Sequence, residues 1–168
     1  MTVNLDANIA RLSSPPLTVQ DPAAEQCWIE HQTLNHVKEA LRITLNWKVG
    51  AVGLPRKLSS IKFTLKSFQR HLARLMKLEE EGGYMSWVCD EKPSLSERAK
   101  LLEGEHERFR RALAHLTAAL DELRSAEETQ FVELCQELES LLQEVDVHDA
   151  KEIELMQEAL LVDEGGEG

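Results

Sequence analysis

The sequence has no run of apolar residues long enough to cross a membrane. A membrane helix needs about 18 or more consecutive apolar residues, and Lys, Arg, Glu or Gln interrupts every candidate run in this chain of 168 residues. Residues 1–20 also lack the basic head and apolar stretch of a secretory signal, since their charged residues are one Asp and one Arg. We therefore expect a soluble protein with no membrane partner.

Cysteines are few, and basic side chains are outnumbered by acidic ones. Cys27, Cys89 and Cys135 are odd in number and widely spaced, which is typical of free thiols in a reducing compartment and not of a disulfide framework or a thiolate zinc site. The 19 Lys and Arg residues face 30 Asp and Glu residues, and the formal charge of −11 has the wrong sign for gripping nucleic acid or anionic lipid. The expectation is a cytoplasmic protein that binds no nucleic acid.

The chain carries no strand signal, and helical signals cover most of it. Helix boundaries are indicated by Asp21-Pro22 as a start, Gly82-Gly83 as a stop, and two capping boxes, Ser94 with Glu97 and Ser125 with Glu128. The four predicted helices span residues 21–47, 57–81, 94–124 and 125–162, with a connector at 48–56 and a loop at 82–93. Short connections between long helices predict an all-α fold, an up-down-up-down antiparallel four-helix bundle.

This bundle is predicted to form one domain over residues 21–163. Residues 1–20 mix Ser, Pro, Thr, Asn and Asp with scattered aliphatic residues, which predicts a flexible leader. Residues 164–168 form an acidic Gly-rich tail. We therefore look for function in the bundle.

The inward stripe of each predicted helix can be read from alternating steps of three and four residues. Read in this way, the four stripes are almost wholly apolar. Their ionisable members, from the first helix to the fourth, are His31 and Lys38, then Glu79, then His106, then His148 and Glu152. The sequence alone does not explain why a lysine, Lys38, lies on the first stripe. This stripe is the least regular of the four.

The histidines and glutamates of these stripes share one height in an antiparallel bundle. An uncompensated buried ion costs several kcal/mol, a large part of a typical stability of about 5 to 15 kcal/mol, so the group must be satisfied by something. Imidazole and carboxylate are ligands that iron, manganese and zinc accept, and bundle cores are where such sites are built. The candidate metal ligands are His31, Glu79, His106, His148 and Glu152.

The pattern resembles the hemerythrin-like (HHE) family, non-haem iron proteins that are four-helix bundles. The residues that carry the resemblance are Glu30-His31-Gln32-Thr33-Leu34, Leu75-Met76-Lys77-Leu78-Glu79, Glu105-His106-Glu107-Arg108-Phe109 and His148-Asp149-Ala150-Lys151-Glu152. It spans about residues 25–166. The resemblance implies iron as cofactor, with two ions bridged by carboxylates such as Glu79 and Glu152, and dioxygen as a further ligand; manganese or zinc would fit the same groups.

One position departs from the family pattern. Leu75 stands where the family carries the histidine of the second helix, so one terminal imidazole is absent. His71, one turn earlier, lies on the flank of the stripe and would need a shift of its helix to replace it. A single metal held by some of the five candidate ligands is therefore favoured over a full dinuclear centre.

Two classes of function follow from these residues. The first is a hemerythrin-like iron-binding protein that binds or senses oxygen or iron, with a depleted ligand set. The alternative is a degenerate, metal-free bundle that acts as a scaffold or regulatory partner. An enzyme ranks third, because no substrate pocket or separate general base is indicated, and no protein partner is identified.

Several other polar residues receive simpler interpretations. His36, His71 and His115 lie off the stripes and are expected to be ordinary surface or boundary histidines. In Glu79-Glu80-Glu81 only the first residue is on a stripe, and the rest are expected to be solvated. Cysteines of this kind usually behave as small buried apolar groups, although Cys27, one turn before His31, leaves a sulfur ligand or a redox role open.

Overall fold

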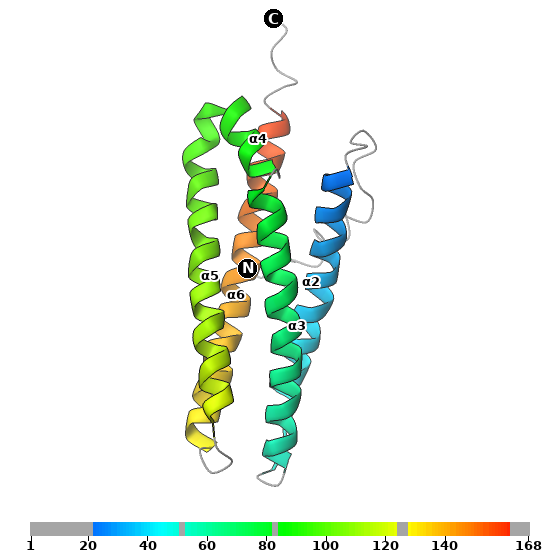
Figure 1. Cartoon of the computed structure of the whole chain (residues 1–168), viewed down its shortest axis with the longest axis vertical. Helices are drawn as coiled ribbons and strands as arrows, with labels where there is room; N and C mark the ends of the chain where they lie inside the picture. The colour runs from blue at the N-terminus through cyan, green and yellow to red at the C-terminus, as the bar shows by residue number, and fades with distance from the viewer. Residues whose placement is uncertain (1–21, 51–52, 82–83, 124–127, 162–168) are drawn as a thin grey trace, which may run out of the picture.

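The fold is an all-α bundle of four long antiparallel helices (Figure 1). The computed structural model describes residues 22–50, 53–81, 84–123 and 128–161, and no strand occurs among them. The long helices are α2 (Pro22–Asn46), α3 (Leu54–Glu80), α5 (Ser96–Glu122) and α6 (Glu128–Leu161). Each packs on two others, since α2 contacts α3 and α6 while α5 contacts the same pair. The predicted bundle is confirmed; the predicted leader 1–20 and tail 164–168 lie outside the described residues.

Three local expectations were wrong. Helix α3 begins at Leu54 and not at Lys57, because Pro55 sits in the first turn, where its missing N–H costs no hydrogen bond. The predicted loop 82–93 contains a helix, α4 (Tyr84–Glu91), followed by a 3₁₀ turn, η3 (Pro93–Leu95). The predicted capping box of Ser94 is not formed, since α5 begins at Ser96 with Leu95 as its N-cap residue and has no side-chain cap. The second box falls at Ser125, outside the described residues.

Most of the core comes from the stripes that the sequence predicted, joined by other residues such as Met76, Leu142 and, from α4, Met85 and Val88. It is divided into two apolar clusters. The larger cluster fills the part of the bundle around Leu65, Phe68, Leu113 and Leu138. The smaller one lies at the end closed by α4, whose Met85 and Val88 pack with residues such as Leu102, Ala99, Leu155 and Ala159. Along both α5 and α6 the polar stripe residues lie between these clusters. The candidate site is therefore enclosed by apolar layers above and below.

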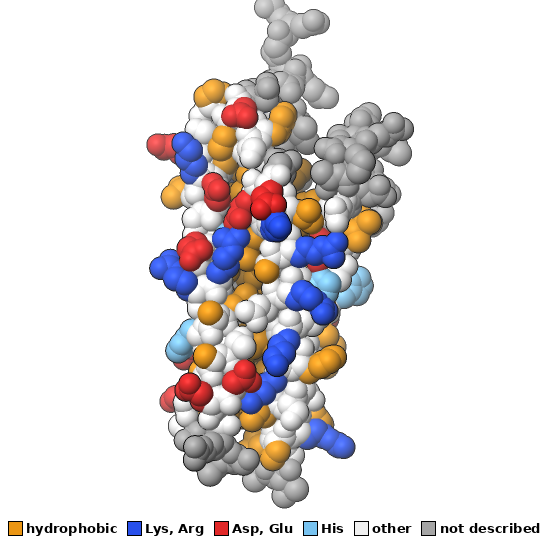
Figure 2. Space-filling view, viewed as in Figure 1, with side chains coloured by type: hydrophobic (Ala, Val, Ile, Leu, Met, Phe, Trp, Pro, Cys, Tyr) orange, Lys and Arg blue, Asp and Glu red, His pale blue; other side chains and the backbone are white. Residues whose placement is uncertain are grey.

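Charged side chains of both signs lie on the face of the bundle that Figure 2 shows. In Figure 2 basic and acidic groups are mixed over the visible face, with isolated apolar side chains between them. Among the described residues, Phe63 and Leu101 are the most exposed of the large apolar side chains, at 80 % and 71 %. No helix among the described residues is long and apolar enough to span a membrane.

Candidate metal centre

The centre of the site is a pair of buried histidines on α5 and α6. His106 has no exposed surface and His148 is 2 % exposed, and their Nε2 atoms are 3.0 Å apart. Glu152, one turn beyond His148, places Oε1 3.0 Å from His148 Nε2 and 3.6 Å from His106 Nε2. The potential ligand atoms of these three residues all lie within 4.8 Å of one another. This is a candidate buried His/His/Glu metal site.

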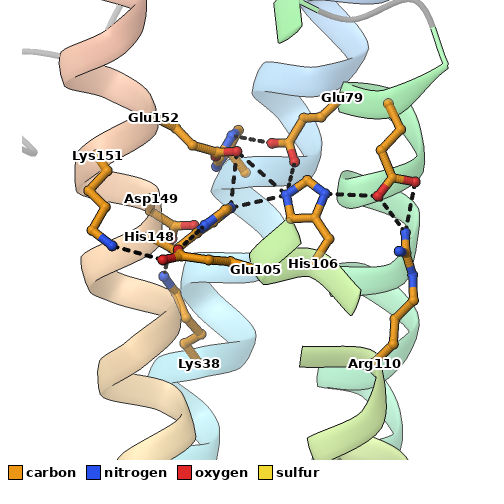
Figure 3. A network of polar contacts seen from close by, with 11 residues as sticks. Lys38, Glu79, Glu105, His106, Arg110, His148, Asp149, Lys151 and Glu152 are labelled. Carbon is orange, nitrogen blue, oxygen red and sulfur yellow. Dashed lines mark hydrogen bonds and ion pairs between the residues drawn. The ribbon is translucent and has the colours of Figure 1, made fainter. Parts of the chain in front are cut away.

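Glu79 on α3 links this group to α2. Its Oε2 lies 3.5 Å from His106 Nε2, and its Oε1 lies 3.2 Å from His31 Nε2. Cys27, His31 and Glu79 form a second group whose ligand atoms are also within 4.8 Å of one another. His31 is the least buried of the five predicted ligands, with 25 % of its side chain exposed. The structure thus brings all five predicted residues into one connected cluster, in which the labelled Glu79, His106, His148 and Glu152 converge (Figure 3).

Two further glutamates orient the central histidines from outside. Glu80 Oε1 is 2.9 Å from His106 Nδ1, and Glu105 Oε2 is 2.9 Å from His148 Nδ1. Each glutamate also contacts a cation, Glu80 through two hydrogen bonds from Arg110 and Glu105 through one from Lys151. Carboxylates at this position fix the orientation and tautomer of a metal-binding imidazole. The site therefore has an outer layer that the stripes did not reveal.

The outer pair stays ionised. Partial burial tends to raise the pKa of Glu80, but hydrogen bonds from Arg110 and His106 outweigh it and hold that pKa below its usual range. Burial acts in the same way on Glu105, where hydrogen bonds from Lys151 and His148 hold the pKa low. Each therefore serves as a hydrogen-bond acceptor for the Nδ1–H of its histidine.

The inner groups hold protons more tightly than usual. Burial, followed by repulsion from Glu152 and Asp149, raises the pKa of Glu79 to about 10. Burial by itself lowers the pKa of His148, but its hydrogen bond and attraction to Glu152 outweigh burial and raise that pKa above 6.5. Burial by itself also lowers the pKa of His31, but the adjacent Cys27 and the nearby negative charge of Asp149 and Glu152 outweigh burial and raise that pKa above 6.5. The metal-free protein therefore keeps a proton on Glu79 near neutral pH, and a bound cation would take the place of such protons.

The remaining histidines lie outside this cluster, and so does Leu75, which stands where the resembled family carries a histidine. Leu75 is 1 % exposed and belongs to the larger apolar cluster. His71 turns its Nδ1 to Glu30 of α2, at 2.5 Å from Oε1, and is in neither candidate group. His36 and His115 are exposed, as expected. Neither Leu75 nor His71 therefore supplies a ligand from α3.

The sequence interpretation missed Glu80 and Glu105. Glu80 was expected to be solvated, but its side chain is only 23 % exposed, whereas Glu81 is 67 % exposed as expected. Both could have been found from their position in the sequence, directly beside a polar stripe residue. Each glutamate is next in sequence to a stripe residue, so it points about 100° around the helix toward a neighbouring helix.

Comparison with protein-family models, curated proteins and solved structures finds no match for this chain.

Proposed function

We propose that this chain is a hemerythrin-like protein that holds non-haem iron, as one or two ions, among His31, Glu79, His106, His148 and Glu152. The support is the way in which the two central imidazoles face each other. Their Nδ1 atoms are occupied by Glu80 and Glu105. We therefore assign the ring proton of each neutral imidazole to Nδ1.

This assignment leaves a lone pair on each Nε2 atom. The two Nε2 atoms are 3.0 Å apart, and a Glu152 oxygen lies within 3.0 Å of one and 3.6 Å of the other. Lone pairs that converge in a dry interior repel one another unless a metal ion or a proton lies between them. A metal ion bound to both imidazoles and the carboxylate meets this need, and the ligand types are those of iron, manganese and zinc sites.

The chain's own residues have distinct parts in this proposal. His106, His148 and Glu152 bind the ion, Glu79 adds a carboxylate from α3, and Glu80 and Glu105 orient the imidazoles. Iron in such a set of ligands supplies a redox-active centre that can respond to dioxygen, which supports a role in binding or sensing oxygen or iron.

Metal analysis of the reconstituted protein tests the proposal. The full chain is purified, treated with a chelator, incubated with Fe²⁺ without air and freed of excess metal. We expect stoichiometric iron, which His148→Ala loses and His115→Ala keeps, because His115 is exposed and remote from the cluster. Absence of stoichiometric iron, manganese or zinc from the wild-type chain would reject the proposal.

A metal-free bundle is the second candidate, and one observation favours it. A proton on His148 lets Nε2–H donate to Glu152 and closes the network without metal. In that case the polar residues serve the fold, and the protein acts as a scaffold or regulatory partner. A chelator would then leave the melting temperature unchanged, and no metal would co-purify or bind.

A further inference from the structure

Cys27 belongs to the polar cluster although its sequence context predicted an inert thiol. It lies one turn before His31 on the same face of α2 and is partly buried against the larger apolar cluster. Its Sγ lies within 4.8 Å of a ring nitrogen of His31. Sulfur, nitrogen and oxygen atoms from Cys27, His31 and Glu79 lie within 4.8 Å of one another. Three different ligand types therefore meet beside the His/His/Glu group.

The Glu79 carboxylate points to a ligand at this second group. Its side chain is 1 % exposed, and its Oε1 receives no hydrogen bond from the described residues although His31 Nε2 is 3.2 Å away. Leaving a buried acceptor without a hydrogen bond costs about 1 to 3 kcal/mol. The other oxygen, Oε2, faces His106. One carboxylate oxygen of Glu79 thus faces the Cys27 and His31 group, and the other faces the His/His/Glu group.

The spacing of these atoms suits a bound ion. Ligands at about 2.0 to 2.3 Å from a tetrahedral ion are roughly 3.3 to 3.6 Å from one another, and the His31 to Glu79 distance of 3.2 Å is close to this value. The upper limit of 4.8 Å for the whole group leaves only small side-chain rotations to be made. Helix α3 offers no imidazole here, since Leu75 is in the apolar core and His71 contacts Glu30.

We propose that Cys27, His31 and Glu79 form a second metal site, which binds a sulfur-accepting divalent ion such as Zn²⁺ or Fe²⁺ and shares Glu79 with the first site. The inference rests on the proposed function, because Glu79 serves both ions. Binding requires the thiol to lose its proton, and a coordinated ion drives this loss. A thiolate ligand favours Zn²⁺ or Fe²⁺ over Mg²⁺, Ca²⁺ or Mn²⁺, which prefer oxygen.

Cobalt titration of the full chain without air tests the second site. Co²⁺ bound to a thiolate gives a near-ultraviolet charge-transfer band that nitrogen and oxygen ligands do not give. We expect two equivalents of Co²⁺ per chain together with this band. Cys27→Ser should lose the band and one equivalent, whereas Cys89→Ser and Cys135→Ser, the matched controls at the other two partly buried free cysteines, should keep both.

The outcomes separate the second site from the proposed function. One equivalent of Co²⁺ without the band, unchanged in Cys27→Ser, would reject the second site and leave the first. No binding of cobalt, iron, manganese or zinc would reject both.

A measurement on the wild-type chain avoids any folding defect of the variant. Zn²⁺ should abolish iodoacetamide labelling of Cys27, mapped by mass spectrometry, and leave labelling of Cys89 and Cys135 unchanged. Equal labelling of Cys27 with and without Zn²⁺ would overturn the second site.

Discussion

Lys38 lies on the inward side of α2, but its ammonium contacts carboxylates and not the apolar core. Its Nζ donates to Asp146 Oδ1 at 2.9 Å and to Asp149 Oδ2 at 2.6 Å, both on α6, and the residue is 4 % exposed. A buried ammonium is tolerated only when it is paired and hydrogen-bonded. Lys38 therefore ties α2 to α6, which explains an inward lysine that the sequence alone did not.

At the same scale, the outer glutamates should control metal affinity without touching the ion. Glu80→Gln and Glu105→Gln keep the size of each side chain but remove the charge that orients His106 or His148. Loss of such an outer partner lowers metal affinity by about 10- to 100-fold. We expect a fall of this size for each variant in competition titrations against a chromophoric chelator.

The matched control for these variants is Glu137→Gln. Glu137 also faces a histidine, His115, but both side chains are exposed and their closest charged atoms are 3.9 Å apart. The metal affinity of the Glu137→Gln variant should equal that of the wild type. Wild-type affinity in both Glu80→Gln and Glu105→Gln would show that the outer carboxylates do not orient ligands.

At the scale of elements, the sequence predicted which face of each long helix is buried, because apolar residues recur at the spacing of the helical turn. The steps of three and four predict that nine residues of α6 face inward, and all nine are buried: Phe131, Leu134, Leu138, Leu141, Val145, His148, Glu152, Leu155 and Ala159. The two polar ones, His148 and Glu152, lie 3.0 Å apart. Helix α4 was missed because it is short and is held by two buried side chains, Met85 and Val88, so it has no long period of its own. The contact between Glu30 and His71 depends on how α2 packs against α3. It could not be predicted from the residue spacing within one helix.

A substitution at Leu75 of α3 tests whether this position faces the proposed metal site. Leu75 lies one turn before Glu79 and is 1 % exposed in the apolar core. Leu75→His removes apolar packing and buries a polar ring, which should lower the unfolding free energy of the metal-free protein by about 2 to 4 kcal/mol. Added Fe²⁺ or Zn²⁺ should restore stability, because the new imidazole provides a further ligand beside Glu79.

Leu72→His is the control for this effect. Leu72 is as deeply buried on the same stripe but lies further from Glu79, so its variant should lose similar stability and regain none from the added imidazole. Chemical denaturation with and without metal measures both. Equal recovery in the two variants, or none in Leu75→His, would show that the register of α3 against the site is wrong.

At the scale of the whole molecule, the cluster draws on α2, α3, α5 and α6 together. His31 comes from α2, Glu79 from α3, His106 from α5, and His148 with Glu152 from α6. An ion held by these residues joins all four long helices, and it is lost when the chain unfolds. Metal binding should therefore stabilise the entire bundle, by about 2.7 kcal/mol when free metal is 100-fold above Kd.

A proton and a metal ion compete for the same groups, so the stabilisation should depend on pH. The carboxyl of Glu79 ionises near 4.5 in the unfolded chain and near 10 in the folded one, so the folded state keeps a proton that the unfolded state loses. Stability of the metal-free protein from this group therefore falls as pH rises between these values. His148 and His31, whose pKa values are raised, act in the same direction. Their contribution is complete below about pH 6.5 and is lost as pH rises through the folded pKa.

The metal-bound protein should behave in the opposite way, since its ligands must be deprotonated and affinity rises with pH. Thermal unfolding followed by circular dichroism, with Zn²⁺ or with a chelator, should show a gap in melting temperature that widens from about pH 5 to about pH 8. Glu79→Gln removes one titrating group, so its metal-free melting temperature should fall less over this range. A gap that stays constant or narrows as pH rises would mean that protons and metal do not share these residues.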